Sequence, residues 1–598
     1  MTSEPKKKRG CLRTGCLTVL ALPIVLVVIA WAMNSWSHRL PGSFVLRLPV
    51  TGQIDERPAD PVSVPFSSGK QPLSLQELLT VMERAGGDAR VRSVLLDIDG
   101  VSAPPAKIEE LRHAIEGLRR SGKRVTAFLH TPEDKDYLLA VACDTVIVQK
   151  GSWLLLDGLK AESFYFAEPL GKLGIGFQAS QWKKYKSAIE PLTRSGSSPE
   201  NREELGQLLQ NSWDDYLGYV SSRRGIDRAV FAGIIDSVAV LSPEQALSRK
   251  LVDRVSSAWQ LEKGYERTTG VKAPDLFVGG HEYLQATGGM EVTGKDGRIA
   301  VINVVGPIVS AGGVEEMADG EGIDEATLKQ ALEIALEDRE VKAIVLRIDS
   351  PGGDALAASS MLEMLEAARK KKPIVASMSG VAASGGYMVA LGTDRIYADP
   401  LTLTGSIGVF ALKPDFSGLL QKAGIKREVL VRGRFADAYT PFKPFDQEAF
   451  SKFDETSGEI YRDFVGKVAA RRKMTFEQVD AVAGGRVWTG RNALDVGLVD
   501  KLGGFGDAVK AAQELAHMDK SRKPGLIFLP AARSWSDYLF GNDSSVTLPG
   551  VASRIAALHL FRALPFSQDL PLQGAARMLL RSDSPRILAL DPVEVVIK

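Results

Sequence analysis

The sequence predicts an α/β protein built from two tandem copies of one unit, each a parallel-type sheet covered by helices. First, "VRSVLLDIDG" (91–100) recurs 250 positions later as "VKAIVLRIDS" (341–350), and such internal similarity indicates a duplicated architecture. Second, the apolar runs inside both stretches are nearly continuous, which is typical of parallel strands buried on both faces. Third, helix-like segments alternate with these strands, which favours βαβ units.

The similarity continues along both copies. "YLLAVACDTVIV" (137–148) matches "YMVALGTDRIYA" (387–398) at the same offset. Between the predicted strands, Ser74 precedes an apolar-periodic run and Glu77 follows three residues later. This pairing predicts a capping box at the start of an amphipathic helix. Each copy therefore reads strand, helix, strand, helix.

These patterns divide the chain into five predicted segments. They are a cytoplasmic basic segment at 1–16, a transmembrane signal anchor at 17–36, an N-terminal domain at 40–290, a C-terminal domain at 291–525 and a tail of unknown role at 526–598. The tail fits neither copy and contains an amphipathic-looking helix. We expect that helix to pack on the body, with a membrane-surface role as the alternative.

The N-terminus carries a membrane signal. "KKKR" (6–9) precedes the uncharged run "LTVLALPIVLVVIAWAM" (17–33), which as a helix would span about 25 Å at about 1.5 Å per residue. The positive-inside rule then predicts a single-pass inner-membrane protein with a cytoplasmic N-terminus and its domains on the extracytoplasmic side. The alternative is a cleaved signal peptide, because Ala30 and Ala32 offer a small-x-small site.

Composition excludes some classes of function. The chain has 598 residues, 44% hydrophobic and 25% charged, with a net charge of +1. This balance is typical of globular domains and gives no sign of a nucleic-acid partner. Only three cysteines occur, and Cys11 and Cys16 lie beside the N-terminal apolar run, so a disulfide framework is not expected.

The stretch "MSGVAASGGYMVA" (378–390) presents a candidate nucleophile. Ser384 lies between a strand-like run and a helix-like run, which is how proteins expose a reactive hydroxyl. No histidine occurs between His281 and His517 to activate it. The first copy has Asp134 at the corresponding position, so only the second copy retains the serine.

The first copy supplies a candidate base in "KKYKSAIEPL" (183–192). Lys186 aligns with Ala436 of the second copy, so the two halves have divided the parts of one site. Burial disfavours an ammonium and lowers the pKa of a lysine, which can then act as a base in a Ser-Lys dyad. Backbone amides of "SPGGD" and of Gly385 could bind the developing oxyanion.

Four motifs together resemble one known family. "RIDSPGGD", "GVAASGGYMVA", "LTLTGSIGV" and "KKYKSAIEP" are similar, in order and separation, to the signal peptide peptidase A family in its long, duplicated, membrane-anchored form. The similarity spans about 45 to 520. It implies the crotonase/Clp-protease fold, here with two domains per chain.

The resemblance also assigns roles. It implies that Ser384 is the nucleophile, that Lys186 is the general base, and that Ser406 orients the amine. It places the oxyanion hole at Gly353, in preference to Gly352, and we add the amide of Gly385 as a second donor.

The implied activity is that of a protease IV-type serine endopeptidase, which degrades cleaved signal peptides and other apolar extended peptides through an acyl-enzyme. The resemblance further implies a homotetramer and no metal or organic cofactor.

The sequence leaves three alternatives open. A crotonase-like acyl-CoA enzyme could use the same glycine-rich oxyanion turn. A non-catalytic membrane scaffold could keep the fold without chemistry. A Ser-His-Asp mechanism would need His130 of the first copy, which lies outside the histidine-free stretch.

Overall fold

The computed structural model describes residues 40–58, 72–272, 275–291, 294, 296–310, 322–530 and 587–590. The predicted anchor at 17–36 and the predicted tail helix lie outside these ranges. Among the described helices, none combines the length and the apolar character that crossing a membrane requires.

The first copy forms a six-stranded sheet in which every neighbouring pair is parallel. Its core lies on both faces of β2, because Val94, Leu96 and Ile98 face one apolar cluster and Leu95 faces another. The near-continuous apolar run is therefore buried on both sides, as predicted. In sheet order the strands are β8 (Arg254–Ser256), β4 (Thr145–Gln149), β3 (Arg124–Leu129), β2 (Val91–Ser102), β1 (Phe44–Gln53) and β9 (Phe277–Gly279).

Helices cover this sheet and include the predicted capping box. Ser74 Oγ accepts the amide of Glu77, and the Glu77 carboxylate accepts the amide of Ser74 at 2.9 Å. The helices of the first half are α2 (Leu75–Gly87), α3 (Pro105–Arg120), α4 (Asp134–Ala140), α5 (Ala167–Leu173), α6 (Glu190–Thr193), α7 (Pro199–Arg224), α8 (Arg228–Ser237), α9 (Pro243–Ser248), α10 (Ala258–Thr269) and α11 (Gly280–Ala286).

The second copy repeats this plan around an eight-stranded sheet, parallel except where β15 meets β17. Tyr137 donates to Leu251 O at 2.8 Å in the first copy, and Tyr387 makes the matching bond to Leu498 O at 2.8 Å in the second. The strands are β10 (Arg298–Val305), β11 (Val341–Ser350), β13 (Ile374–Ala383), β14 (Arg395–Ala398), β15 (Leu403–Gly405), β17 (Val487–Thr489), β18 (Lys501–Leu502) and β19 (Gly525–Leu529). Because β19 pairs with β10, the second sheet continues past the predicted boundary at 525.

The helices of the second half complete its layers. α14 and α15 pack together on one side of the sheet, and α20 packs on β11 and β13. The helices are α13 (Glu325–Glu337), α14 (Ala355–Ala368), α15 (Gly385–Ala390), α16 (Ser417–Lys422), α17 (Gln447–Arg472), α18 (Phe476–Val482), α19 (Gly490–Asp495) and α20 (Phe505–Leu515).

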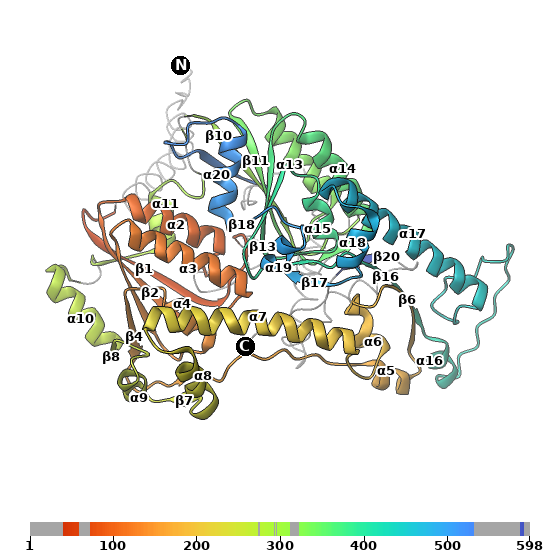
Figure 1. Cartoon of the computed structure of the whole chain (residues 1–598), viewed down its shortest axis with the longest axis horizontal. Coiled ribbons are helices and arrows are strands. Elements are labelled where there is room, and N and C mark those ends of the chain that lie inside the picture. The colour runs from red at the N-terminus through yellow and green to blue at the C-terminus, as the bar shows by residue number, and fades with distance from the viewer. Residues whose placement is uncertain are drawn as a thin grey trace, which may run out of the picture.

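A third sheet, which the sequence did not predict, connects the two halves. Its order is β12 (Gly352–Asp354), β20 (Ile587–Leu590), β16 (Val409–Asp415) and β6 (Gly176–Trp182), and all neighbours are antiparallel. β6 belongs to the first half, yet it pairs along its whole length with β16 of the second half. The long helix α7 also runs beneath both halves (Figure 1), with Asn211 donating to Asn492 at 2.7 Å.

Buried ion pairs fix the halves against each other. Arg347 of the second half is fully buried and contacts Glu110 at 2.6 Å and Glu56 at 2.7 Å, both from the first half. Lys107 contacts Asp349 across the same junction at 2.8 Å. Burial by itself would lower the pKa of Lys107, but the carboxylates of Asp349 and Glu56 raise it above its usual value. Removing one partner would leave an uncompensated buried charge, so the junction strongly resists separation.

Candidate active site

Ser384 lies at a sharp corner between β13 and α15. Its backbone has φ 55° and ψ −114°, an unfavourable region for a residue with a Cβ. The corner is held because the Ser384 amide donates to Gly405 O at 2.8 Å. A Cβ at Gly386 would lie 2.7 Å from Ser350 O, so glycine lets the helix start close against the end of β11. Strain of this kind gathers at functional sites.

Lys186 reaches Ser384 from the other half of the chain. Its Nζ lies 2.9 Å from Ser384 Oγ, although 198 positions separate the two residues. Lys186 is 1% exposed and Ser384 is 0% exposed. The structure therefore brings the two predicted residues together in a buried contact.

Ser406 provides two further oxygens to the same amine. Lys186 Nζ lies 2.8 Å from Ser406 Oγ and donates to Ser406 O at 3.1 Å. Ser406 has φ 49° and its amide donates to Arg486 O at 2.8 Å. The amine is thus bracketed between Ser384 and Ser406.

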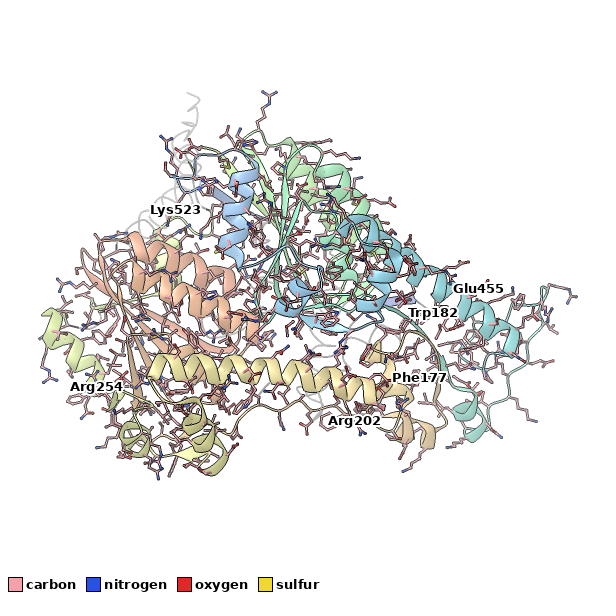
Figure 2. All side chains as sticks on the ribbon, in the orientation of Figure 1. Phe177, Trp182, Arg202, Arg254, Glu455 and Lys523 are labelled. Atoms are coloured by element: carbon pink, nitrogen blue, oxygen red, sulfur yellow. The ribbon has the colours of Figure 1, made fainter. Side chains whose placement is uncertain are left out.

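The strand that carries Lys186 is anchored by α17. Figure 2 labels Phe177 and Trp182 on β6, with Trp182 beside α17. Trp182 Nε1 donates to Asp454 O at 2.9 Å, and its ring stacks on Tyr461. A Cβ at Gly458 would lie 2.2 Å from the indole. The indole therefore seats β6 on α17 four residues before Lys186.

A glycine pair that sequence reasoning missed packs directly on Lys186. Gly484 O accepts the amide of Tyr185 at 3.0 Å, and the Gly485 amide donates to Ile407 O at 2.9 Å. A Cβ at Gly485 would lie 2.5 Å from Lys186 N. This turn joins the lysine segment to the Ser406 segment. The only signal in the sequence was "GG" at 484–485, which by itself predicts no more than a turn.

The predicted oxyanion glycines lie beside the nucleophile. A Cβ at Gly385 would lie 3.3 Å from Gly353 N, so these two glycines are neighbours. Gly353 has φ 157°, and a Cβ there would overlap Ile308 O at 1.9 Å. The Gly352 amide already donates to Ser350 Oγ at 3.2 Å, which favours Gly353 over Gly352 as an oxyanion donor.

His130, the residue required by the Ser-His-Asp alternative, makes other contacts. Its Nε2 lies 2.6 Å from Asp97 Oδ1 and its Nδ1 lies 2.9 Å from Gln149 Oε1. Both ring nitrogens are therefore engaged within the first sheet. The side chain that contacts Ser384 Oγ is Lys186.

Comparison with known proteins first defines the class. The chain is 33% identical to serine protease SPPA, chloroplastic, of Arabidopsis thaliana, over 86% of this chain and 75% of that protein. It is 30% identical to Protease 4 of Haemophilus influenzae, over 74% of this chain and 73% of that one. The chain is a serine protease, and this finding decides against the acyl-CoA and scaffold alternatives.

The family follows from a second match. The profile of peptidase family S49 matches residues 117–272 and 366–519, once in each half. The chain belongs to peptidase family S49. A solved structure, ClpP1 of Listeria monocytogenes, matches 35% of this chain at 14% identity with a TM-score of 0.23. That score is too low to support the fold, which is defined here by the strand pairing of the chain itself.

Proposed function

We propose that this protease hydrolyses released signal peptides and other apolar, extended peptides through a dyad of Ser384 and Lys186. The observation that carries the proposal is the buried 2.9 Å contact between Lys186 Nζ and Ser384 Oγ. That distance lies within the range required for direct proton transfer. A serine hydroxyl becomes an effective nucleophile when such a base accepts its proton.

The hydrogen bonds around the amine support this role. A neutral amine has two N–H bonds and one lone pair. If both N–H bonds are donated to Ser406 O and Ser406 Oγ, at 3.1 Å and 2.8 Å, the lone pair is left for the hydroxyl of Ser384. Burial favours this neutral form because a desolvated ammonium is costly. Ser406 is then a positioning residue.

The reaction follows from this arrangement. Ser384 Oγ attacks the scissile carbonyl carbon while its proton moves to Lys186 Nζ. The amides of Gly353 and Gly385 bind the oxyanion. The ammonium then gives the proton to the leaving amine, the C–N bond breaks, and an acyl ester forms on Ser384. Water, deprotonated by the same amine, hydrolyses the ester and restores the serine.

The third sheet supports an extended substrate. β12 contains Gly353, and a single strand fits between β12 and β16 in antiparallel pairing with both. Main-chain pairing of this kind gives affinity without strict sequence demands. A relative from Enterococcus faecium, 30% identical over 40% of this chain, bears the name putative signal peptide peptidase SppA. A released signal peptide is apolar and can adopt the extended conformation that this main-chain pairing requires.

Location and assembly complete the proposal. The predicted anchor at 17–36 would hold the protease on the extracytoplasmic side of the inner membrane, where signal peptides are released. We propose a homotetramer, and self-association is supported by apolar side chains exposed on the segment between α16 and α17. Leu430 is 94% exposed, with Ile425 and Phe442 nearby in the chain and also exposed, and exposed apolar groups of this kind mark interaction surfaces.

The test compares two substrates for the full-length enzyme in detergent. One is a quenched fluorescent 20-residue apolar peptide and the other is a folded globular protein of the same total concentration. We expect turnover of the peptide to exceed that of the folded protein by about 100-fold, and Ser384→Ala to abolish both. Equal turnover of the two substrates would contradict the proposed specificity.

A further inference from the structure

A segment from the end of the chain lies inside the third sheet. β20 (Ile587–Leu590) is flanked by β12 on one side and β16 on the other, and Figure 1 labels β20 close to β16. Its register pairs Ala589 with Gly353 and Leu588 with Phe410. The position between β12 and β16 is therefore filled by the protein's own backbone.

The direction of β20 is that of a substrate approaching the dyad. Leu588 pairs with Phe410 and Ile587 with Ala411, so the chain advances toward the start of β16 as its numbering rises. β16 starts three residues after Ser406, which contacts Lys186. The C-terminal end of β20 thus points to the end of the sheet where the amine lies.

The register agrees with this direction. Asp354, Gly353 and Gly352 pair with Leu588, Ala589 and Leu590 in turn. Residues that precede a scissile bond would pair with β12 in the same order, and the bond itself would follow near the glycines. β20 therefore occupies the place that the proposed function gives to the residues before the cleavage site.

We propose that the segment 587–590 is an intramolecular ligand of the groove between β12 and β16, and that it competes with peptide substrates. The competition rests on the proposed function, whereas the docking rests on the strand pairing alone. Three features support this occupant. It is apolar in sequence, "ILAL", like the proposed substrates, and Pro585 and Pro592 bound it. Proline lacks the amide that a central strand needs, so pairing is confined to the segment between them. The segment is also tethered, which gives a local concentration on the order of millimolar.

The consequence is a reduced apparent affinity for substrate. A peptide in solution binds only the fraction of enzyme whose groove is free. Its apparent dissociation constant therefore equals the intrinsic dissociation constant divided by that fraction. Occupancy by the tethered strand would raise KM and leave kcat unchanged. Enzyme whose groove holds β20 would therefore not cleave peptides until their concentration is high enough to displace the strand.

The first experiment breaks the strand and leaves the chain full length. Ala589→Pro removes a backbone donor in the middle of β20, and Ala575→Pro places the same substitution elsewhere in the tail as the control. We expect Ala589→Pro to lower KM for the fluorescent peptide by about 3-fold or more at constant kcat, with the control like the parent enzyme. A synthetic peptide of residues 582–593 should raise the KM of Ala589→Pro competitively. Equal KM values for parent and Ala589→Pro would overturn the competition.

The second experiment detects docking without catalysis. Hydrogen exchange is measured at 352–354 and 409–412 in the Ser384→Ala background, with and without Ala589→Pro. We expect faster exchange in both segments when the proline is present and no change with Ala575→Pro. Identical exchange in all three proteins would overturn docking. Faster exchange together with no peptidase activity in the Ser384 enzyme would refute the proposed function and leave the docking intact.

Discussion

The two halves of the chain contain the same strand-to-helix corner with opposite chemistry. In the second half the corner holds Ser384, with Gly385 and Gly386 opening the helix. In the first half the corresponding residues are Asp134, Lys135 and Asp136. The corner that lost its serine has gained two carboxylates.

These carboxylates are bound by amides at the end of the first sheet. Asp136 accepts from Val101 N at 2.8 Å and Glu133 N at 3.0 Å. Asp134 accepts from Asp157 N at 3.1 Å and Gly158 N at 3.2 Å. The second half has Gly386 at the position of Asp136, so its corner carries no such carboxylate beside Ser384.

The comparison teaches how duplication separated two tasks. The first half closed its own corner with internal hydrogen bonds and delivers Lys186 through β6 instead. The second half retained the strained serine and the glycines. Features that serve the shared fold, such as the matching bonds of Tyr137 and Tyr387, stayed the same in both.

The largest expected effect is the loss of kcat when Ser384 or its partner Lys186 is replaced, compared with replacement of Asp134 at the matching corner. Lys186→Ala and Ser384→Ala should each lower kcat by roughly 10⁴-fold or more, and the double variant should lose no more, because the pair acts as a unit. Asp134→Ala, at the matching corner of the first half, is the control and should keep kcat within a few-fold of the parent. Steady-state kinetics on the fluorescent peptide measures all four. Additive losses in the double variant would show that the two residues act independently.

A smaller effect is expected at the glycine turn under the lysine. Gly485→Ala would place a Cβ 2.5 Å from Lys186 N and displace the base, which should lower kcat on the order of 100-fold. The matched control is Gly484→Ala. Gly484 has a similar positive φ, 71° against 83°, but its Cβ would meet only Lys183 Cβ at 3.5 Å. Both variants carry similar backbone strain, so equal losses of kcat would mean that strain, and not lysine position, determines the result.

The smallest effect concerns stability and leaves activity unchanged. Burial raises the pKa of Asp134 to about 7, whereas the unfolded chain has the ordinary value near 3.8. The folded state therefore holds the proton more tightly, and its stability falls as pH rises from about 4 to about 7. Asp134→Asn removes this loss, which is up to about 4 kcal/mol. Thermal melts at several pH values measure the melting temperature of Asp134→Asn and of the parent. The difference between the two, variant minus parent, should increase from about pH 4 to about pH 7 and stay constant above that. A difference independent of pH would contradict the raised pKa.

Local patterns predicted much of this structure. The duplicated strands and the capping box at Ser74 could be inferred because the repeat and the local periodicity are present in the sequence, whereas the roles of Ser384 and Lys186 were implied by the resemblance of four motifs to a known family. The third sheet could not be inferred in this way. β6 pairs with a strand more than 220 positions away, and no local pattern encodes such a register.

Two other features, the Gly484–Gly485 turn and the strand at 587–590, could not be predicted from the sequence for the same reason. The Gly484–Gly485 turn resembles any surface turn until its contact with Lys186 is known. The strand at 587–590 was read as part of a tail of unknown role, because four apolar residues do not reveal their partners. Both sites depend on distant segments meeting, which only the folded chain determines.

The most direct measurement asks whether the amine activates the serine. A fluorophosphonate that reacts with activated serines is incubated with parent enzyme and with Lys186→Ala, and intact mass and peptide mapping follow the adduct. The account predicts one adduct on Ser384 in the parent enzyme and labelling reduced to the background rate in Lys186→Ala. Labelling of Ser384 at the parental rate in Lys186→Ala, or an adduct on a different serine in the parent, would contradict the account.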